Sequence, residues 1–453
     1  MTTADAPVLL TPFRTAVGSI GRGFATHTVD ALAAPVLAAV AQAVAGAGIP
    51  IDDLLLGNCL GPGGNIARVS ALRAGLGLNV PAVTVDRQCG SGLDAVLQAV
   101  ARVAAGHAQL VLAGGAESAS TAPWRYWPPE PGTDVPRHRY ERAPFAPVGM
   151  SDPEMGPAAD ALAAHYSISR ERQDAWAARS HHRATRTQAS GGFVAEIVPV
   201  GVPGTLGTAG TLGTPGTPET AGTLGTPGVN TTIATDDRPR AALTITTLAR
   251  FPAAFTPGGT VTAGNSCGIS DGAAALAVTT ETVRQRLGVP GLRVIATAVT
   301  AGDSALPGIG AATAIQGVCQ RAGVVPGEIA HVEITEAFAA QVLAVTDVVG
   351  IDEDTVSSQG GAIALGHPWG ASGAILLVRL AARMGTLSPL SGSDTATYPG
   401  STTHPTTPHP DNTAHTQPSE RSGLKQYRSR TLGLAACSIG GGQGIAILVE
   451  RVG

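Results

Sequence analysis

The chain has 453 residues, of which 43% are hydrophobic, and its formal net charge is −4. This length is enough for two or three domains or one duplicated domain, and the near-neutral charge argues against a nucleic-acid-binding protein or a disordered acidic chain. The five cysteines are odd in number and widely spaced, which fits neither a disulfide framework nor a zinc site. We find no basic patch followed by an apolar core at the N-terminus, and no uninterrupted apolar run of membrane-spanning length. We therefore expect a cytoplasmic protein without a metal, a nucleic-acid partner or a membrane partner.

The first part of the chain alternates between predicted helices and predicted strands. Residues 28–47 are rich in Ala, Leu and Val and predict a helix, whereas residues 82–85 predict a short buried strand. A second helix is predicted from residue 93 to a stop near Gly106, followed by a buried strand at residues 110–113 and further helix over 156–187. This alternation predicts an α/β layer architecture.

Three segments interrupt the pattern. Residues 121–155 are rich in Pro, Arg and aromatic side chains and predict an extended excursion from the sheet. Residues 203–228 repeat Gly-Thr-Leu-Gly-Thr-Pro units, and residues 386–424 are dense in Ser, Thr, Pro and His. The last two segments carry too few apolar side chains to offset the entropy of ordering, so we expect inserted surface loops. We interpret the histidines of the second insertion as solvated loop residues and not as metal ligands.

Cys89 is a candidate nucleophile at the start of the helix that follows residues 82–85. A thiol at a helix N-terminus lies near the positive end of the helix dipole and near free backbone N–H groups, which favours the thiolate. Gly90 and Gly92 would let a substrate approach the backbone closely. Taken alone, a buried structural cysteine is the more common interpretation, so the decision depends on partners elsewhere in the chain.

Three later stretches supply such partners. His367 lies in a glycine-rich turn, and its imidazole either takes a proton from a thiol or merely bonds to the backbone. Residues 433–444 contain a Cys-Ser pair and three consecutive glycines, whose N–H groups can face an anion, ahead of a predicted strand at 445–449. Residues 333–339 predict a strand end that runs into a helix, where a polar side chain can face the same cavity or cap the helix.

A faint internal repeat relates two of these segments. Ser91-Gly92 and Ser372-Gly373 each follow a glycine-rich turn and lead into an apolar helix. Two similar α/β halves packed together would place both turns at one central site.

Together these stretches resemble the thiolase family, and the resemblance covers nearly the whole chain apart from the two insertions. Its motifs are found in residues 57–68, 86–93, 113–118, 168–174, 236–240, 259–265, 360–373 and 433–444. Each is weak alone, but their occurrence in family order is highly specific.

The resemblance implies a duplicated, five-layered α-β-α-β-α fold with a loop domain inserted in the first half. We expect the N-terminal half to comprise residues 1–120 and 253–279, the loop domain residues 121–252, and the C-terminal half residues 280–453.

Thiolases make or break the carbon–carbon bond of 3-oxoacyl-coenzyme A thioesters by a ping-pong route. The resemblance implies that Cys89 carries the acyl group as a thioester, that His367 accepts the thiol proton, and that a second cysteine moves a proton at the α-carbon. We assign that second role to Cys437. The resemblance also implies that the Cys89 and Gly440 amides stabilise a negative oxygen, and Thr335 stands where the family has a water-holding Asn.

Met155, Phe255, Ala263 and Phe338 match positions that line the pantetheine channel in the family, and Cys267 stands where a serine is common. The resemblance implies acyl-coenzyme A and coenzyme A as substrates, no further cofactor, and a homodimer or homotetramer. Acetyl-coenzyme A acetyltransferase or 3-ketoacyl-coenzyme A thiolase is the expected activity.

The C-terminal motif departs from the family. Alignment by the glycines puts Ser438 at the position of the second cysteine, with Cys437 one residue earlier, and adjacent strand residues point to opposite faces. If Ser438 faces the site, carbon–carbon chemistry would be slow because a hydroxyl is a poor base, while acyl transfer to Cys89 would survive. Two alternatives therefore stay open: a ketoacyl-synthase-type condensing enzyme, and a non-catalytic acyl-coenzyme A binding or scaffold subunit.

Overall fold

The protein is described by a computed structural model that covers residues 5–135, 139–140, 142–201, 232–387 and 431–453. The two predicted insertions, 203–228 and 386–424, lie outside these ranges apart from residues 386 and 387. Their character as surface loops stays a prediction.

The N-terminal half of the main sheet has the strand order β4-β3-β5-β10-β1. β3 is parallel to both β4 and β5, whereas β10 is antiparallel to β5 and β1. The short strand β2 (Gly18–Ser19) pairs with β10. The strands are β1 (Pro7–Arg14), β3 (Asp53–Gly57), β4 (Ala82–Val85), β5 (Leu110–Ser118) and β10 (Ser270–Thr280).

The C-terminal half continues the same sheet in the order β12-β13-β14-β11, and β11 pairs with β1 at the junction. Its strands are β11 (Gly291–Ala301), β12 (His331–Ile334), β13 (Leu432–Ile439) and β14 (Gln443–Val452). The predicted boundary at residues 279 and 280 falls at the end of β10, where α7 (Glu281–Leu287) leads into β11.

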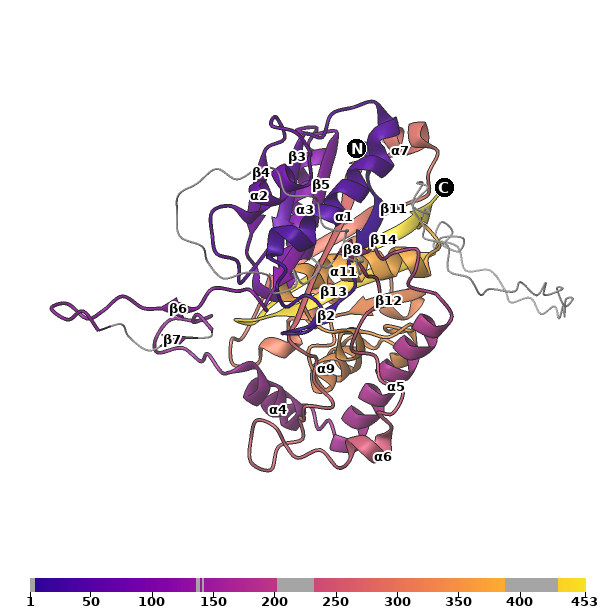
Figure 1. Ribbon diagram of the computed structural model, residues 1–453. Coiled ribbons are helices and arrows are strands. Elements are labelled where there is room, and N and C mark those ends of the chain that lie inside the picture. The colour runs from indigo at the N-terminus through magenta and orange to yellow at the C-terminus, as the bar shows by residue number, and fades with distance from the viewer. Residues whose placement is uncertain (1–4, 136–138, 141, 202–231, 388–430) are drawn as a thin grey trace, which may run out of the picture.

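Helices cover the two halves of the sheet in three layers, two outer and one central (Figure 1). α1 (Val29–Val44) and α2 (Ile66–Arg73) share an apolar core with the outer face of the N-terminal half. α8 (Gly310–Ala322) and α9 (Ala339–Val349) do the same for the C-terminal half. α3 (Ser91–Ala104) and α11 (Trp369–Arg383) lie between the halves and pack on strands of both. The chain thus has the five-layered α-β-α-β-α fold.

The segment Val29–Ala47, which comprises α1 and the following turn, is 19 residues long with a mean hydropathy of 1.7. By length and composition it could cross a membrane, although Asp30 and Gln42 interrupt its apolar run. Its apolar stripe, which includes the fully buried Leu32, Val36 and Leu37, packs against β10 and β5. These contacts are those of a core helix in a globular fold.

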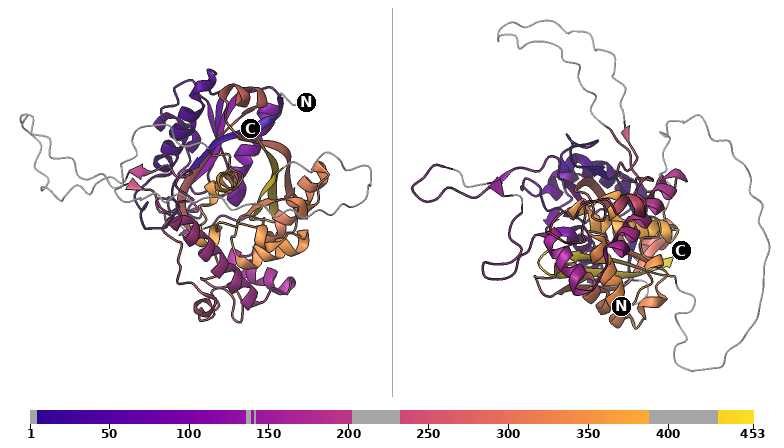
Figure 2. Two further views of the ribbon diagram at one scale, coloured as in Figure 1. Left: turned by 90° about the vertical axis from the view of Figure 1, so that its right-hand side faces the viewer. Right: turned by 90° about the horizontal axis from the view of Figure 1, so that it is seen from below.

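α10 (Ala362–Leu365) lies just before His367 in the C-terminal half, and the segment between β5 and β10 forms a further group of elements. Its start, the predicted excursion at 121–155, contains the small hairpin of β6 (Arg125–Tyr126) and β7 (Arg139–Tyr140), which projects from the body of the protein (Figures 1 and 2). The predicted helix at 156–187 is two helices, because the chain turns at Ser167 and Ser169 caps the second one. The other elements are α4 (Met155–His165), α5 (Arg170–Ala189), β8 (Val200–Gly201), β9 (Thr232–Ile233) and α6 (Ile245–Leu248).

The predicted strand at residues 82–85 exists, but it is not buried. β4 ends the sheet, so one of its edges has no neighbour among the described strands, and Val83 is 38% exposed. A short β-branched run is found at sheet edges as well as in sheet centres, and the sequence pattern alone does not separate the two.

Candidate active site

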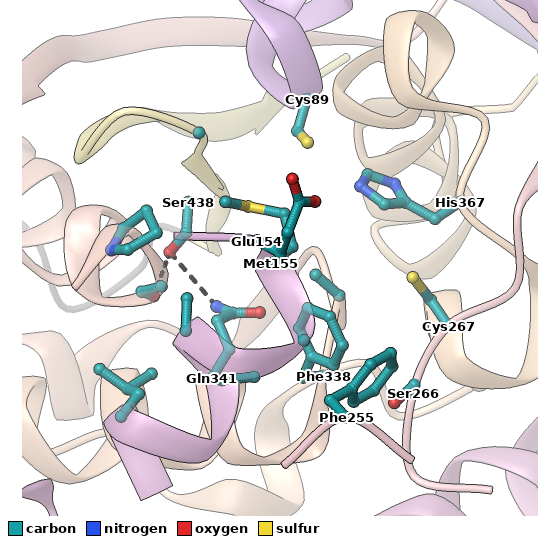
Figure 3. Close-up of a pocket in the computed structure, with 18 of the residues that line it drawn as sticks. Cys89, Glu154, Met155, Phe255, Ser266, Cys267, Phe338, Gln341, His367 and Ser438 are labelled. Atoms are coloured by element: carbon teal, nitrogen blue, oxygen red, sulfur yellow. Dashed lines mark hydrogen bonds between the residues drawn. The ribbon is translucent and has the colours of Figure 1, made fainter. Parts of the chain in front are cut away.

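A tight turn between β4 and α3 presents Cys89. The residue lies in a single 3₁₀ turn, Gln88–Gly90, directly before α3, and Gln88 has φ of 42° in the left-handed region. The hydroxyl of Ser91 accepts a hydrogen bond from the Arg87 N–H at 2.8 Å and donates one to the Gln88 carbonyl at 2.6 Å. These bonds hold the strained turn, which points the Cys89 thiol into a cavity (Figure 3).

Gly90 and Gly92 serve the packing of the two halves. A Cβ on Gly92 would lie 2.7 Å from the carbonyl oxygen of Gly370 at the start of α11. A Cβ on Gly90 would overlap the side chain of Ile439 in β13. Both glycines let segments of the C-terminal half approach Cys89 closely, and the expected approach of a substrate to this backbone stays a prediction.

His367 precedes α11 and is 2% exposed. Its Nδ1 lies 2.6 Å from the hydroxyl of Ser372, which itself donates to the Pro368 carbonyl at 3.0 Å. Because the Ser372 proton is used in that bond, the hydroxyl accepts from Nδ1–H, which fixes the tautomer. Nε2 is buried and has no hydrogen-bond partner in the described part of the chain, so its lone pair is free to act as a base.

The resting forms of this pair are neutral. Burial, and then the neighbouring Cys437 and Cys267 thiols, raise the pKa of the Cys89 thiol to about 12. Burial lowers the pKa of His367 to about 4. Desolvation disfavours the charged forms of both groups, so the thiolate that was expected at a helix N-terminus is not the favoured form of Cys89.

Cys89 and His367 face one cavity of about 670 Å³, within the size range of small-molecule sites. Of the other predicted residues, Met155, Phe255, Cys267, Phe338 and Gly440 line it too. The rings of Phe255 and Phe338 meet edge to face, with centroids 6.0 Å apart. The cavity thus joins the motifs of both halves with the loop segment, mostly through apolar side chains.

Cys437 is not among the residues that line this cavity, although its thiol lies close enough to Cys89 to raise the pKa of that thiol. Ala435, Cys437 and Ile439 share the face of β13 that packs into the central layer, whereas Ala436 faces the outer helices. The Cys437 thiol is fully buried, lies 3.1 Å from the Thr335 hydroxyl and has a pKa raised to about 12 by burial. Strand alternation puts Ser438 on the other face, where it lines the cavity.

Thr335 and Ala263 are also not at the cavity. The Thr335 side chain is buried against Cys437 and lines a separate void of about 20 Å³, together with Ser372. Ala263 is exposed and does not line the cavity. The expected water-holding role of Thr335 and the expected channel role of Ala263 therefore have no counterpart in the cavity.

Sequence reasoning missed several lining residues. Gln341, on the helix after the Glu-Ala-Phe-Ala stretch, donates a hydrogen bond to Ser438, and Trp369 follows the His-Pro pair. Both lie within or beside motifs that the sequence did single out. Glu154, which precedes Met155 and pairs with Arg142 at 3.2 Å, also lines the cavity, but no sequence motif indicated it.

Two buried carboxylates hold the motifs together. Glu117 accepts from the side-chain amide of Asn58 and from the backbone N–H groups of Cys59, Leu60 and Gly370, at 2.9–3.1 Å. It therefore ties the loop after β3 to the start of α11, beside His367. These hydrogen bonds connect three of the motifs: the Gly-Asn stretch at residues 57–58, the Ala-Glu-Ser stretch at residues 116–118 and the histidine motif at residues 360–373.

Glu336 ties α5 to the segment before His367. Its carboxylate accepts from Trp176 Nε1 at 3.0 Å, from the Ser180 hydroxyl at 2.7 Å and from the Ile363 N–H at 3.1 Å. Burial raises the pKa of Glu336 to about 7. The carboxylate thus orients the cavity wall and does not line it.

Family models agree with this geometry over most of the chain. The model described as "Thiolase, N-terminal domain" matches residues 8–282, and the one described as "Thiolase, C-terminal domain" matches residues 289–393. The chain belongs to the thiolase family. It is an acyltransferase of that family, as the relatives below also indicate.

Similar sequences include "Putative acetyl-CoA C-acetyltransferase YhfS" of Bacillus subtilis, 38% identical over 77% of this chain and 84% of that protein. A second, "Putative acetyl-CoA C-acetyltransferase VraB" of Staphylococcus aureus, is 40% identical over 73% of this chain and 80% of that protein. The crystal structure of the Bacillus anthracis acetyl-CoA acetyltransferase superposes with a TM-score of 0.79 at 27% identity, over the full length of both chains.

Proposed function

We propose that this thiolase-family chain transfers acyl groups of coenzyme A thioesters through an acyl-thioester on Cys89, making or cleaving 3-oxoacyl-coenzyme A by a ping-pong route. One observation supports this most directly: the Cys89 thiol and the free Nε2 of the fixed His367 tautomer line the same apolar cavity. The relatives named as acetyl-coenzyme A acetyltransferases support a coenzyme A thioester as the substrate.

In the proposed first half-reaction, the Cys89 sulfur attacks the thioester carbonyl while its proton passes to Nε2 of His367. The bond from the carbonyl carbon to the coenzyme A sulfur then breaks, and the proton returns from His367 to the departing sulfur. Developing negative charge on the carbonyl oxygen would be met by the N–H groups of Cys89 and Gly440, which both border the cavity.

Gly440 is suited to that role because it opens the turn between β13 and β14. Gly441 and Gly442, which follow it, have φ of 75° and 78°, a left-handed geometry that other residues rarely adopt. A substituent on Gly440 would overlap the ring of Phe145. A Gly440→Ala change is therefore expected to displace the turn that presents this amide.

Mass spectrometry of the protein incubated with acetyl-coenzyme A tests the proposal. One acetyl group should be added and should map to Cys89, with no addition to Cys89→Ala and slower addition to His367→Ala. The Cys267→Ala variant, which lacks the other thiol that lines the cavity, is the matched control. A folded protein that binds acetyl-coenzyme A but forms no Cys89 adduct would favour the scaffold alternative.

The family matches favour a thiolase over a ketoacyl synthase, and a malonyl-dependent reaction that releases carbon dioxide would reverse that preference. Assembly as a homodimer or homotetramer and location in the cytoplasm stay predictions. Light scattering of the purified protein measures its oligomeric state.

A further inference from the structure

The family resemblance assigns carbon–carbon chemistry at this site one group more than acyl transfer. Cleavage of a 3-oxoacyl thioester releases an enolate that must take a proton at its α-carbon, and condensation must remove a proton from the same atom. A positioned base or acid for such a step contributes about 10² to 10⁴ in rate. The family resemblance implies that a group other than His367 moves this proton.

Ser438 is not free to be that group. Its hydroxyl donates to the Gly308 carbonyl at 2.6 Å and accepts from the Ala311 N–H at 3.1 Å and from Gln341 Nε2 at 3.3 Å. The single proton and both lone pairs are therefore in use. Figure 3 shows the Ser438 oxygen turned toward Gln341 and away from Cys89. Abstraction of an α-proton would require these bonds to break and would use a hydroxyl, which is a weak base.

The neighbouring groups do not replace it. Cys437 lies near Cys89, but its thiol is fully buried, is hydrogen-bonded to Thr335 and does not line the cavity. The Cys267 thiol lines the same cavity, but burial raises its pKa to about 12, which disfavours the basic thiolate. The Glu154 carboxylate borders the cavity, but its side chain is 70% exposed and pairs with Arg142.

We propose that acyl exchange between two thiols is the faster reaction of this site, exceeding carbon–carbon cleavage by at least about a hundredfold. This inference rests on the proposed acylation of Cys89. Here the acceptor thiol attacks the acyl-Cys89 carbonyl and gives its proton to His367. The bond to the Cys89 sulfur breaks, and that sulfur takes the proton back, so no other reactant is needed.

The acceptor should be a pantetheine-type thiol. Incoming and leaving thiols share one cavity, whose walls include Met155, Phe255 and Phe338. These apolar side chains suit a long, weakly polar arm and give little to hold a short, hydrated thiol. A pantetheine arm should therefore reach Cys89 more effectively than a small thiol of similar reactivity.

The test compares two rates in the same preparation. Transfer of acetyl from acetyl-coenzyme A to pantetheine is followed by chromatography, with Cys89→Ala giving the uncatalysed background and 2-mercaptoethanol as the small-thiol control. Thiolysis of acetoacetyl-coenzyme A is followed by loss of enolate absorbance. We expect exchange to be at least about a hundredfold faster than thiolysis, and pantetheine to exceed 2-mercaptoethanol. In Ser438→Cys the ratio of thiolysis to exchange should rise at least about tenfold, because a thiol forms weaker bonds to Gly308 and Ala311.

Equal exchange and thiolysis rates in the unaltered protein would overturn the inference, and loss of thiolysis in Glu154→Gln would then identify the base. An unchanged ratio in Ser438→Cys would also count against it, provided that the variant is folded by circular dichroism. Equal rates for pantetheine and 2-mercaptoethanol would overturn the acceptor class. Failure of Cys89 to acetylate at all is a different result, because it removes the proposed function itself.

Discussion

The Ser372 hydroxyl lies 2.6 Å from Nδ1 of His367 and donates its own proton to the Pro368 carbonyl. This chain of two bonds leaves Nε2 of the imidazole as the acceptor that faces the cavity. Ser372 thus sets which nitrogen of His367 is basic, although it does not line the cavity itself.

Replacement of Ser372 by Ala should slow acetylation of Cys89 by about tenfold to a hundredfold, because the imidazole loses the partner that fixes its tautomer. Ser372→Thr restores the hydroxyl and should recover most of the rate. Stopped-flow or quench mass spectrometry measures the rate of adduct formation. If Ala and Thr variants behave alike, the hydroxyl has no role in orienting His367.

The neutral resting pair predicts how Cys89 reacts with iodoacetamide. With a thiol pKa of about 12, the thiolate fraction and hence the alkylation rate should rise about tenfold for each pH unit between 7 and 10. Peptide-level mass spectrometry distinguishes Cys89 from Cys267, whose pKa burial also raises to about 12. A flat rate from pH 5 to 8 would instead indicate a thiolate–imidazolium pair.

Cys437 should be dispensable for acyl chemistry. Cys437→Ala should acetylate Cys89 within about threefold of the unaltered rate, yet lose about 1 kcal/mol of unfolding free energy through the small cavity left in the core. Adduct formation and urea denaturation measure the two effects. A drop of more than tenfold in acetylation, with the fold intact, would return Cys437 to the catalytic set.

Glu196 links two buried arginines, since its carboxylate pairs with Arg14 at 2.7 Å and with Arg379. Glu196→Ala should lower the unfolding free energy by about 3–5 kcal/mol, because two guanidinium groups lose a buried partner. Arg73→Gln is the control: its pair with Asp30 is 54% exposed on the arginine side and should contribute less than about 1 kcal/mol. Similar losses of unfolding free energy in both variants, measured by urea denaturation, would contradict the stabilising role of Glu196 between the two buried arginines.

The sequence alone determined the layer architecture and most of the site. Local patterns placed helices and strands, because apolar spacing reflects which face of an element is buried. Glycine-rich motifs around Cys89, His367 and Gly440 identified turns that meet at one cavity. Met155, Phe255 and Phe338, which the family resemblance assigned to a pantetheine channel, also line that cavity.

Only the tertiary structure decided how these residues are used. Which of Cys437 and Ser438 lines the cavity depends on which face of β13 packs against the central helices. The local sequence, which consists of small and apolar residues, does not determine that face. The charge state of Cys89 depends on how much water the assembled halves exclude, which outweighs the local helix dipole. The bonds that occupy Ser438 come from Gly308, Ala311 and Gln341, all about a hundred or more residues away in the chain. Contacts between distant segments, and the desolvation they impose, are properties of the folded chain and not of any local pattern.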